Sequence, residues 1–178
     1  ELTRNIAQRF NGDFNSPNFL KIPEPLIHKD FSRIMSLKEG TQKMSKSDPS
    51  DQSRINLTDT KDQIVNKIRK AKTDSDLLPE NINELKNRYE LKNLLGIYSS
   101  LKNQNLNESI NEFSGKNFSQ LKEKLAEVLV EKIYPISNEI NKLLKDQKHI
   151  DEILLEGSKK AEKISKKKVD EIKKKIGF

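Results

Sequence analysis

Apolar residues at helical spacing fill almost the whole chain beyond Ser53, and this pattern limits what the chain can fold into. Ile64, Ile68 and Ala71 lie three or four residues apart, which places them on one face of a helix. The pattern predicts a mainly α protein in which several amphipathic helices form a bundle. The spacing recurs, and predicts further helices, over residues 91–101, 105–113, 119–144 and 151–176.

Cap and turn residues set the expected ends of these helices. We expect Ser119 to cap the long helix and Asp151 to open the last one, since their side chains can accept from free backbone N–H groups. Gly115 is expected to stop the short helix that precedes Ser119. Pro135 lies inside the long helix, but the apolar period resumes at Ile136, so we expect a kink rather than an end.

The first fifty residues follow a different pattern. Leu2, Ile6 and Phe10 recur every four residues and predict a short helix ending near Asn11. Prolines then favour an extended loop over residues 13–30. The stretch 31–37 predicts a buried strand that leads into a cationic loop. A loop in that place suits an anion, because ligands of open α/β sheets bind beyond the carboxyl ends of the strands.

The cationic loop, Lys43–Ser47, combines two lysines and two serines between Gly40 and Pro49. Lysine carries its charge on a flexible stem that can follow phosphate oxygens, and small hydroxyl residues let the backbone approach closely. A nucleoside triphosphate is the natural ligand of such a loop. Lysine-rich turns are, however, more often solvated surface loops than binding sites, so composition alone leaves both interpretations open.

The order of the loop residues is more specific than their composition. Lys-Met-Ser-Lys-Ser at 43–47 is identical to the second signature of the class I aminoacyl-tRNA synthetases. It follows Arg-Ile-Met-Ser-Leu at 33–37 and precedes Asp48-Pro49, and in this arrangement it resembles the bacterial-type tryptophanyl-tRNA synthetase family. The likeness extends at varying strength over essentially the whole chain and includes residues 1–7, 70–75, 93–98 and 176–178.

This resemblance implies a division of the chain into two parts. Residues 1–53 would be the last helix and strand of a Rossmann-like catalytic domain that carries the loop. Residues 54–178 would be the α-helical, anticodon-binding C-terminal domain. The implied reaction is ATP-dependent activation of L-tryptophan to tryptophanyl-adenylate, followed by transfer to tRNA(Trp). The Mg²⁺ would arrive with the phosphates of ATP, with no metal site built by the protein.

The resemblance also implies roles for individual residues. Lys43, Lys46 and Ser47 would be catalytic, because they face the charge that develops on the leaving pyrophosphate. The main chain of Ile34 and Met35 would contact the adenine. We expect the side chain of Met44 to pack rather than to bind. The implied ATP-binding residues are Ile34, Met35, Lys43, Met44, Ser45, Lys46 and Ser47.

The chain departs from the family at its start. The family's first signature is not present, since residues 27–29 do not match it, and the tryptophan pocket is expected mostly upstream of Glu1. There is no initiating methionine, and Glu1 falls at the start of a predicted helix. We therefore expect a C-terminal fragment that is inactive alone and that belongs to a homodimer in the intact enzyme.

Net charge and composition indicate which kinds of molecule the chain can bind. A net charge of +7 favours an anionic partner such as RNA, although a lysine-, asparagine- and isoleucine-rich composition explains the charge equally well. For the lysine-rich tail, Lys159–Lys175, we favour a solvated helix face over an RNA site, because its lysines surround the helix and aromatic stacking partners are missing.

Further absences exclude other classes of protein. The chain has no cysteine and no apolar run long enough to cross a bilayer, so we expect a cytoplasmic protein without disulfides or membrane contact. His28 and His149 are far apart in the sequence, and we interpret both as surface or structural residues rather than metal ligands.

Two alternatives to a tryptophanyl enzyme remain. A tyrosyl-tRNA synthetase carries the related signature, but Asp48-Pro49 and the C-terminal residues favour the tryptophanyl family. A stand-alone helical RNA-binding module would explain the charge and the helices. It gives no reason for residues 33–37 to precede the loop in this order.

Overall fold

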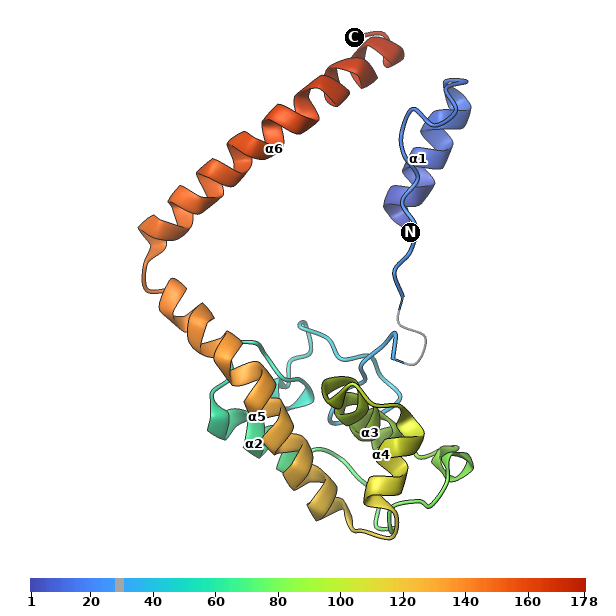
Figure 1. Cartoon of the computed structure of the whole chain (residues 1–178), viewed down its shortest axis with the longest axis vertical. Coiled ribbons are helices and arrows are strands. Elements are labelled where there is room, and N and C mark those ends of the chain that lie inside the picture. The colour runs from blue at the N-terminus through green and yellow to red at the C-terminus, as the bar shows by residue number, and fades with distance from the viewer. Residues whose placement is uncertain (28–30) are drawn as a thin grey trace. The chain divides into compact units, whose positions relative to one another are not determined.

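Helices dominate the computed structural model, which describes residues 1–27 and 31–178 (Figure 1). The prediction of a mainly α fold is confirmed. Within the described residues, backbone pairing of the β type is limited to one isolated antiparallel bridge between Met35 and Lys43. The helices are α1 (Leu2–Asp13), α2 (Lys61–Arg69), α3 (Tyr89–Lys102), α4 (Leu106–Phe113), α5 (Phe118–Leu143) and α6 (Gln147–Ile176), with 3₁₀ turns η1 (Asp51–Ser53) and η2 (Ile82–Leu85).

The chain divides into two compact units. One unit contains Glu1–His28 together with Asp146–Phe178, and the other contains Lys29–Lys145. The cationic loop and helices α2 to α5 belong to the second unit. These units follow spatial packing, and the division into a catalytic and a helical domain after residue 53 stays a prediction.

The second unit is a helical bundle with one apolar core. Helix α2 packs against α5, and α3 packs against both α4 and α5. The rings of Tyr98 and Phe113 meet edge to face, with centroids 5.0 Å apart, where α3 meets α4. Ile64, Ile68 and Ala71 are buried, as their spacing predicted. The other fully buried side chains of the core include Leu91, Leu94, Leu95, Ile110, Leu121 and Leu125.

Two predicted helix starts were wrong, and both were placed too late. Asn117, not Ser119, caps α5, because Asn117 and Gln120 form a reciprocal capping box that satisfies two backbone N–H groups. The last helix begins at Gln147 rather than at Asp151, and the side chain of Asp146 accepts from the N–H of His149 at 3.1 Å. Helix α5 continues through Pro135, as predicted.

The strand predicted over residues 31–37 is not formed. Its backbone groups pair with irregular partners instead of with a neighbouring strand. The N–H of Leu37 donates to the carbonyl of Ser53 at 2.9 Å, and the N–H of Ser36 donates to the carbonyl of Gln42 at 2.8 Å. Both backbone groups of Met35 are bound by the side chain of Asn93. The segment is therefore one arm of a short irregular hairpin.

The first unit contains α1 and the long terminal helix α6. Helix α1 was predicted from the spacing of Leu2, Ile6 and Phe10. Helix α6 has no buried residue. The ammonium groups of Lys168 and Lys175 lie over the ring of Phe19, at 4.1 and 4.9 Å from its centroid. Every lysine of the tail is exposed, which agrees with a solvated face, and a role of the tail in RNA binding stays untested. Among the described helices, none has both the length and the apolar character needed to cross a bilayer.

Candidate functional site

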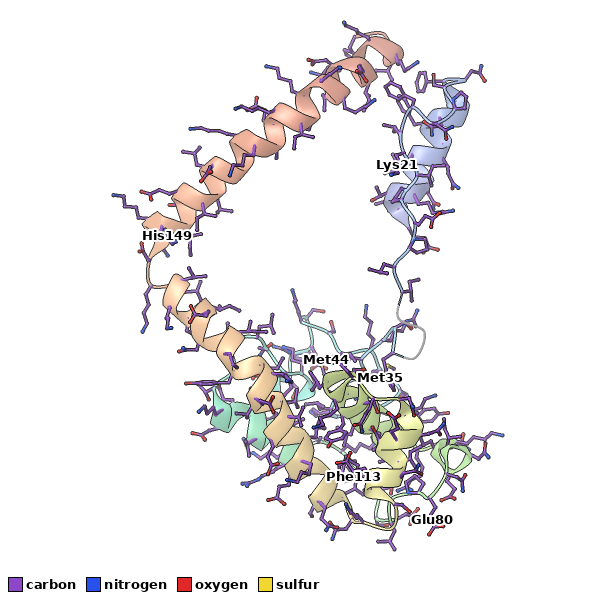
Figure 2. All side chains as sticks on the ribbon, in the orientation of Figure 1. Lys21, Met35, Met44, Glu80, Phe113 and His149 are labelled. Carbon is purple, nitrogen blue, oxygen red and sulfur yellow. The ribbon has the colours of Figure 1, made fainter. Side chains whose placement is uncertain are left out.

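The hairpin that carries the predicted site joins residues 34–37 to residues 42–44. Besides the bridge between Met35 and Lys43, the N–H of Met44 donates to the carbonyl of Ile34 at 3.0 Å. Figure 2 shows Met35 and Met44 close to one another at the edge of the bundle. The side chain of Met44 packs against the core cluster, as expected, and whether it also contacts ATP stays a prediction. Lys43 is thereby fixed beside Met35 through its backbone while its side chain stays exposed.

The loop beyond Lys43 is a compact, exposed turn. The hydroxyls of Ser45 and Ser47 are 2.9 Å apart, and the N–H of Ser47 donates to Oγ of Ser45 at 3.3 Å. Within residues 1–27 and 31–178, neither Lys43 nor Lys46 forms an ion pair. The turn thus presents two cations and two hydroxyls to solvent, an arrangement suited to a polyanion.

Arg54 fixes the far end of the loop. Its Nη1 donates to the carbonyls of Asp48 and Ser50, at 2.9 and 3.3 Å. The N–H of Ser50 donates to the carboxylate of Asp48 at 2.7 Å, and the hydroxyl of Ser53 donates to the carbonyl of Ser50 at the same distance. Both ends of the loop are therefore anchored, and Lys43, Ser45, Lys46 and Ser47 between them are exposed.

A charged clamp ties the tip of the hairpin to the first turn of α3. The ammonium of Lys72 lies 3.0 Å from the carboxylate of Glu90 and 3.3 Å from that of Glu39. These hydrogen bonds raise the pKa of Lys72. Hydrogen bonds from Thr41 and then Lys72 lower the pKa of Glu39. Burial by itself would raise the pKa of Glu90, but Lys72 and nearby backbone N–H groups bring it below its usual value. All three groups are charged at neutral pH.

Gly40 lets the hairpin approach α3 closely. A Cβ at this position would lie 2.6 Å from the backbone nitrogen of Glu90 and 2.7 Å from the carbonyl carbon of Tyr89. Both atoms belong to the helix backbone and cannot swing aside. The tip of the hairpin therefore rests directly on the main chain of α3, which gives the loop a rigid base.

A buried ion pair supports the segment that follows the loop. Lys67, on α2, is 2% exposed, and its ammonium lies 2.7 Å from carboxylate oxygens of both Asp51 and Asp59. The hydrogen bond from Lys67, followed by one from Asn56, lowers the pKa of Asp51. The hydroxyl of Ser137, on α5, donates to the carbonyl of Asp59 at 2.8 Å. This network joins the turn η1 to α2 and α5.

Asn93 touches the site, and it was missed as a functional candidate in the sequence. Its side chain is 6% exposed and hydrogen-bonds both the N–H and the carbonyl of Met35. The sequence carried no signal for this contact, because Asn93 follows Leu91 by two residues and so falls off the apolar stripe of the predicted helix. Asn93 accepts from the N–H of Met35 and donates to its carbonyl. The only backbone group of Met35 that remains for a ligand is therefore the second lone pair of its carbonyl oxygen.

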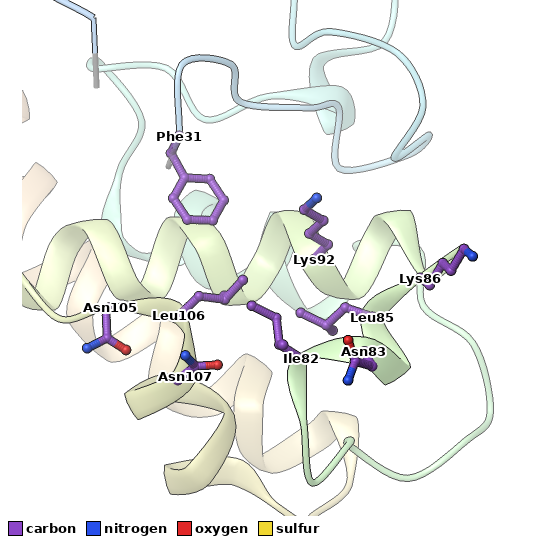
Figure 3. A pocket seen from close by; sticks show the side chains of 9 residues that line it. All are labelled: Phe31, Ile82, Asn83, Leu85, Lys86, Lys92, Asn105, Leu106 and Asn107. Atoms are coloured by element: carbon purple, nitrogen blue, oxygen red, sulfur yellow. The ribbon is translucent and has the colours of Figure 1, made fainter. Parts of the chain in front are cut away.

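A separate hollow of about 760 Å³ lies against α3 on another side (Figure 3). The side chain of Phe31 stands over α3, where a Cβ on Gly96 would collide with the ring. Ile82, Leu85 and Leu106 supply apolar walls, and Lys86 and Lys92 supply charge. None of the predicted site residues lines this hollow, so it is distinct from the candidate loop.

The structure brings the predicted site residues together. Ile34, Met35 and Lys43–Ser47 occupy one continuous hairpin and turn, and whether they bind or catalyse stays a prediction. His149 is exposed in the first turn of α6, and His28 lies outside the described residues. In the part of the chain that the structure describes, no three His, Cys, Asp or Glu side chains are grouped as metal ligands would be.

Comparison with known proteins gives consistent results. The family model described as "tRNA synthetases class I (W and Y)" matches residues 1–135. A tryptophan–tRNA ligase of Caulobacter vibrioides is 48% identical over 178 residues, which are all of this chain and 52% of the Caulobacter protein. The chain thus spans about half the length of the curated relatives it matches.

Solved structures agree in fold. The crystal structure of tryptophanyl-tRNA synthetase from Mycoplasma pneumoniae matches with a TM-score of 0.78 and 28% identity, over 99% of this chain and 54% of that one. The Campylobacter jejuni enzyme, solved with ADP and tryptophan, matches with a TM-score of 0.64 and 24% identity, over 98% and 52% of the two chains, and shows likeness of fold. Since the family model covers most of its length, the chain belongs to the class I tRNA synthetases of the W and Y family.

Proposed function

We propose that this chain supplies the ATP loop and the tRNA-facing helices of a tryptophan–tRNA ligase. The observation that carries the proposal is the hairpin that holds Lys43 beside Met35 and leaves Lys43 and Lys46 without an ion pair among the described residues. The similarity to the Caulobacter ligase supports the choice of amino acid. Neither the tyrosyl enzyme nor the helical RNA-binding module is favoured by the relatives.

In the proposed first step, the carboxylate of tryptophan attacks the α-phosphorus of ATP. A bond forms between a carboxylate oxygen and phosphorus, the bond from phosphorus to the bridging oxygen breaks, and pyrophosphate leaves. Negative charge moves onto the leaving group, where Lys43 and Lys46 stabilise the transition state more than bound ATP. Ser45 and Ser47 hold the phosphates in register through their hydroxyls and backbone N–H groups.

The adenine would lie against the main chain of Ile34 and Met35. Since Asn93 occupies the N–H of Met35, the free carbonyl lone pair of Met35 and the backbone of Ile34 are the groups left for it. The Campylobacter enzyme, which shares this fold, was solved with ADP, and this supports ATP as a substrate. When bound, Mg²⁺ supplies charge neutralisation on the phosphates, and it prefers phosphate oxygens and water to an all-protein cage.

The remaining partners follow from the proposed ligase activity. The tRNA(Trp) would contact the helical part of the chain, whose net positive charge suits a phosphate backbone. L-tryptophan would bind mostly to residues outside this chain, and the intact enzyme would be a homodimer. The second step moves the tryptophanyl group from the adenylate to the tRNA. Such an enzyme works in the cytoplasm, where proteins are made.

Tryptophan-dependent exchange between ATP and pyrophosphate tests this proposal. The gene product is read from its natural start and assayed with tryptophan and with tyrosine in parallel. We expect exchange with tryptophan alone. Exchange with tyrosine would assign the chain to the sister enzyme. No exchange with either amino acid would instead support a helical RNA-binding module.

A further inference from the structure

The side chain of Asn93 hydrogen-bonds both backbone polar groups of Met35. Its Oδ1 accepts from the N–H of Met35 at 2.9 Å, and its Nδ2 donates to the carbonyl of the same residue at 2.8 Å. We propose that Asn93 is a positioning residue for ATP: through Met35 it sets the place of Lys43. This inference rests on the proposed ligase function, because it concerns the nucleotide of that reaction.

The burial of Asn93 indicates a specific use for its amide. Asn93 is 6% exposed although it lies off the helix face formed by Leu91, Leu94 and Leu95, on the side of α3 that meets Met35. A buried amide is costly unless its donor and acceptor are both bound. Here both partners belong to one residue, 58 positions away in the sequence. The paired bonds fix the position and the orientation of that peptide, as a neighbouring strand would.

The position of Met35 passes directly to the loop. Met35 pairs with Lys43 in the antiparallel bridge, and hydrogen bonds of 3.0 and 2.8 Å close the hairpin on either side of it. A shift of Met35 therefore moves the expected adenine contact and the first loop lysine together. The side chain of Asn93 on α3 thus sets the position of the expected adenine contact relative to the expected phosphate contact. A misplacement of about 1 Å in such a site can cost about 100-fold in rate.

A second buried polar residue of α3 offers a matched control. The hydroxyl of Ser99 donates to the carbonyl of Leu95 at 2.8 Å and lies 2.6 Å from the hydroxyl of Ser109. These contacts join α3 to itself and to α4, and the hairpin takes no part in them. A substitution at Ser99 therefore weakens the same helix without touching Met35.

The test compares Asn93→Ala, Asn93→Ser and Ser99→Ala in the full gene product by ATP–pyrophosphate exchange. The side chain in Asn93→Ser is too short to hold Met35, but its own hydroxyl can bond to the helix carbonyl one turn earlier. This variant therefore carries the test if Asn93→Ala does not fold. Losing two part-buried hydrogen bonds is expected to raise the KM for ATP about tenfold and to lower kcat, while the KM for tryptophan stays within about twofold. Ser99→Ala is expected to lower the melting temperature with no ATP-specific change.

Three results would overturn the assignment. A folded Asn93 variant with an unchanged KM for ATP would show that the amide does not position the nucleotide. An equal rise in the KM for ATP in Ser99→Ala would reduce Asn93 to a general structural role. A wild-type protein without tryptophan-dependent exchange would remove the proposed function itself, and the role of Asn93 with it.

Discussion

At the residue scale, motif residues and supporting residues were predictable to different degrees. The loop Lys43–Ser47 could be found from the sequence because the role proposed for it depends on the type and order of its side chains. Asn93 could not, since its role depends on a partner 58 positions away. The burial of Lys67 was also missed. A lysine in an amphipathic helix is expected on the solvated face, and only the fold brings Asp51 and Asp59 close to it.

Lys67→Met tests the buried pair at this scale. Removing the ammonium leaves the carboxylate of Asp59, itself 4% exposed, without its main partner. Breaking a buried ion pair from one side is expected to lower the free energy of unfolding by about 3–5 kcal/mol. Urea denaturation measures this change.

Lys142→Met is the matched control for that substitution. Lys142 pairs with Glu139 at 2.6 Å, but both side chains are more than half exposed. An exposed pair contributes about 0–1 kcal/mol, so the control should unfold nearly like the wild type. Equal losses in the two variants would contradict a special role for the buried pair.

At the element scale, the helices were predicted well and the expected strand was not. Apolar periodicity identifies α2, α3, α4 and α5 because each helix is stabilised by its own turns and one buried face. Helix starts depend on single cap residues, and several polar residues near α5 and α6 could serve, so Ser119 and Asp151 were the wrong choices. A strand depends on partners distant in the sequence, and residues 31–37 pair instead with Asn93, Gln42 and Ser53.

Gly40→Ala tests whether the hairpin must rest on α3. The added Cβ would overlap the backbone of Tyr89 and Glu90, so the hairpin has to move away from the helix. We expect overpacking to lower the free energy of unfolding by about 1–3 kcal/mol and ATP-dependent exchange to fall with it. Urea denaturation and the exchange assay measure the two effects.

Gly157→Ala serves as the control at the same scale. Gly157 lies inside α6, with nothing within 4 Å of an added Cβ. Alanine in a helix interior is favoured over glycine by about 0.5–1 kcal/mol, so this variant should be slightly more stable than the wild type. A Gly40→Ala protein that behaved like this control would show that the close approach to α3 is not required.

At the scale of the whole molecule, the fold and the family follow from the sequence more readily than the chemistry does. Helical periodicity gave the mainly α fold, and the family model covers residues 1–135. The proposed reaction would need ATP and an amino acid bound at once, and this chain spans about half the length of its curated relatives. The proposed activity is therefore tested in the full gene product.

The most direct test of the central claim, that the loop of this chain activates tryptophan, is the exchange rate of Lys46→Ala. It is measured in the full gene product beside Lys70→Ala, which removes the same charge from an exposed position at the end of α2. Loss of one preorganised charge contact is expected to raise the barrier by about 3–4 kcal/mol, or about 100–1,000-fold in rate. Lys70→Ala should exchange like the wild type, and tryptophan binding should change little in either variant. A normal exchange rate in Lys46→Ala would contradict the catalytic role of the loop.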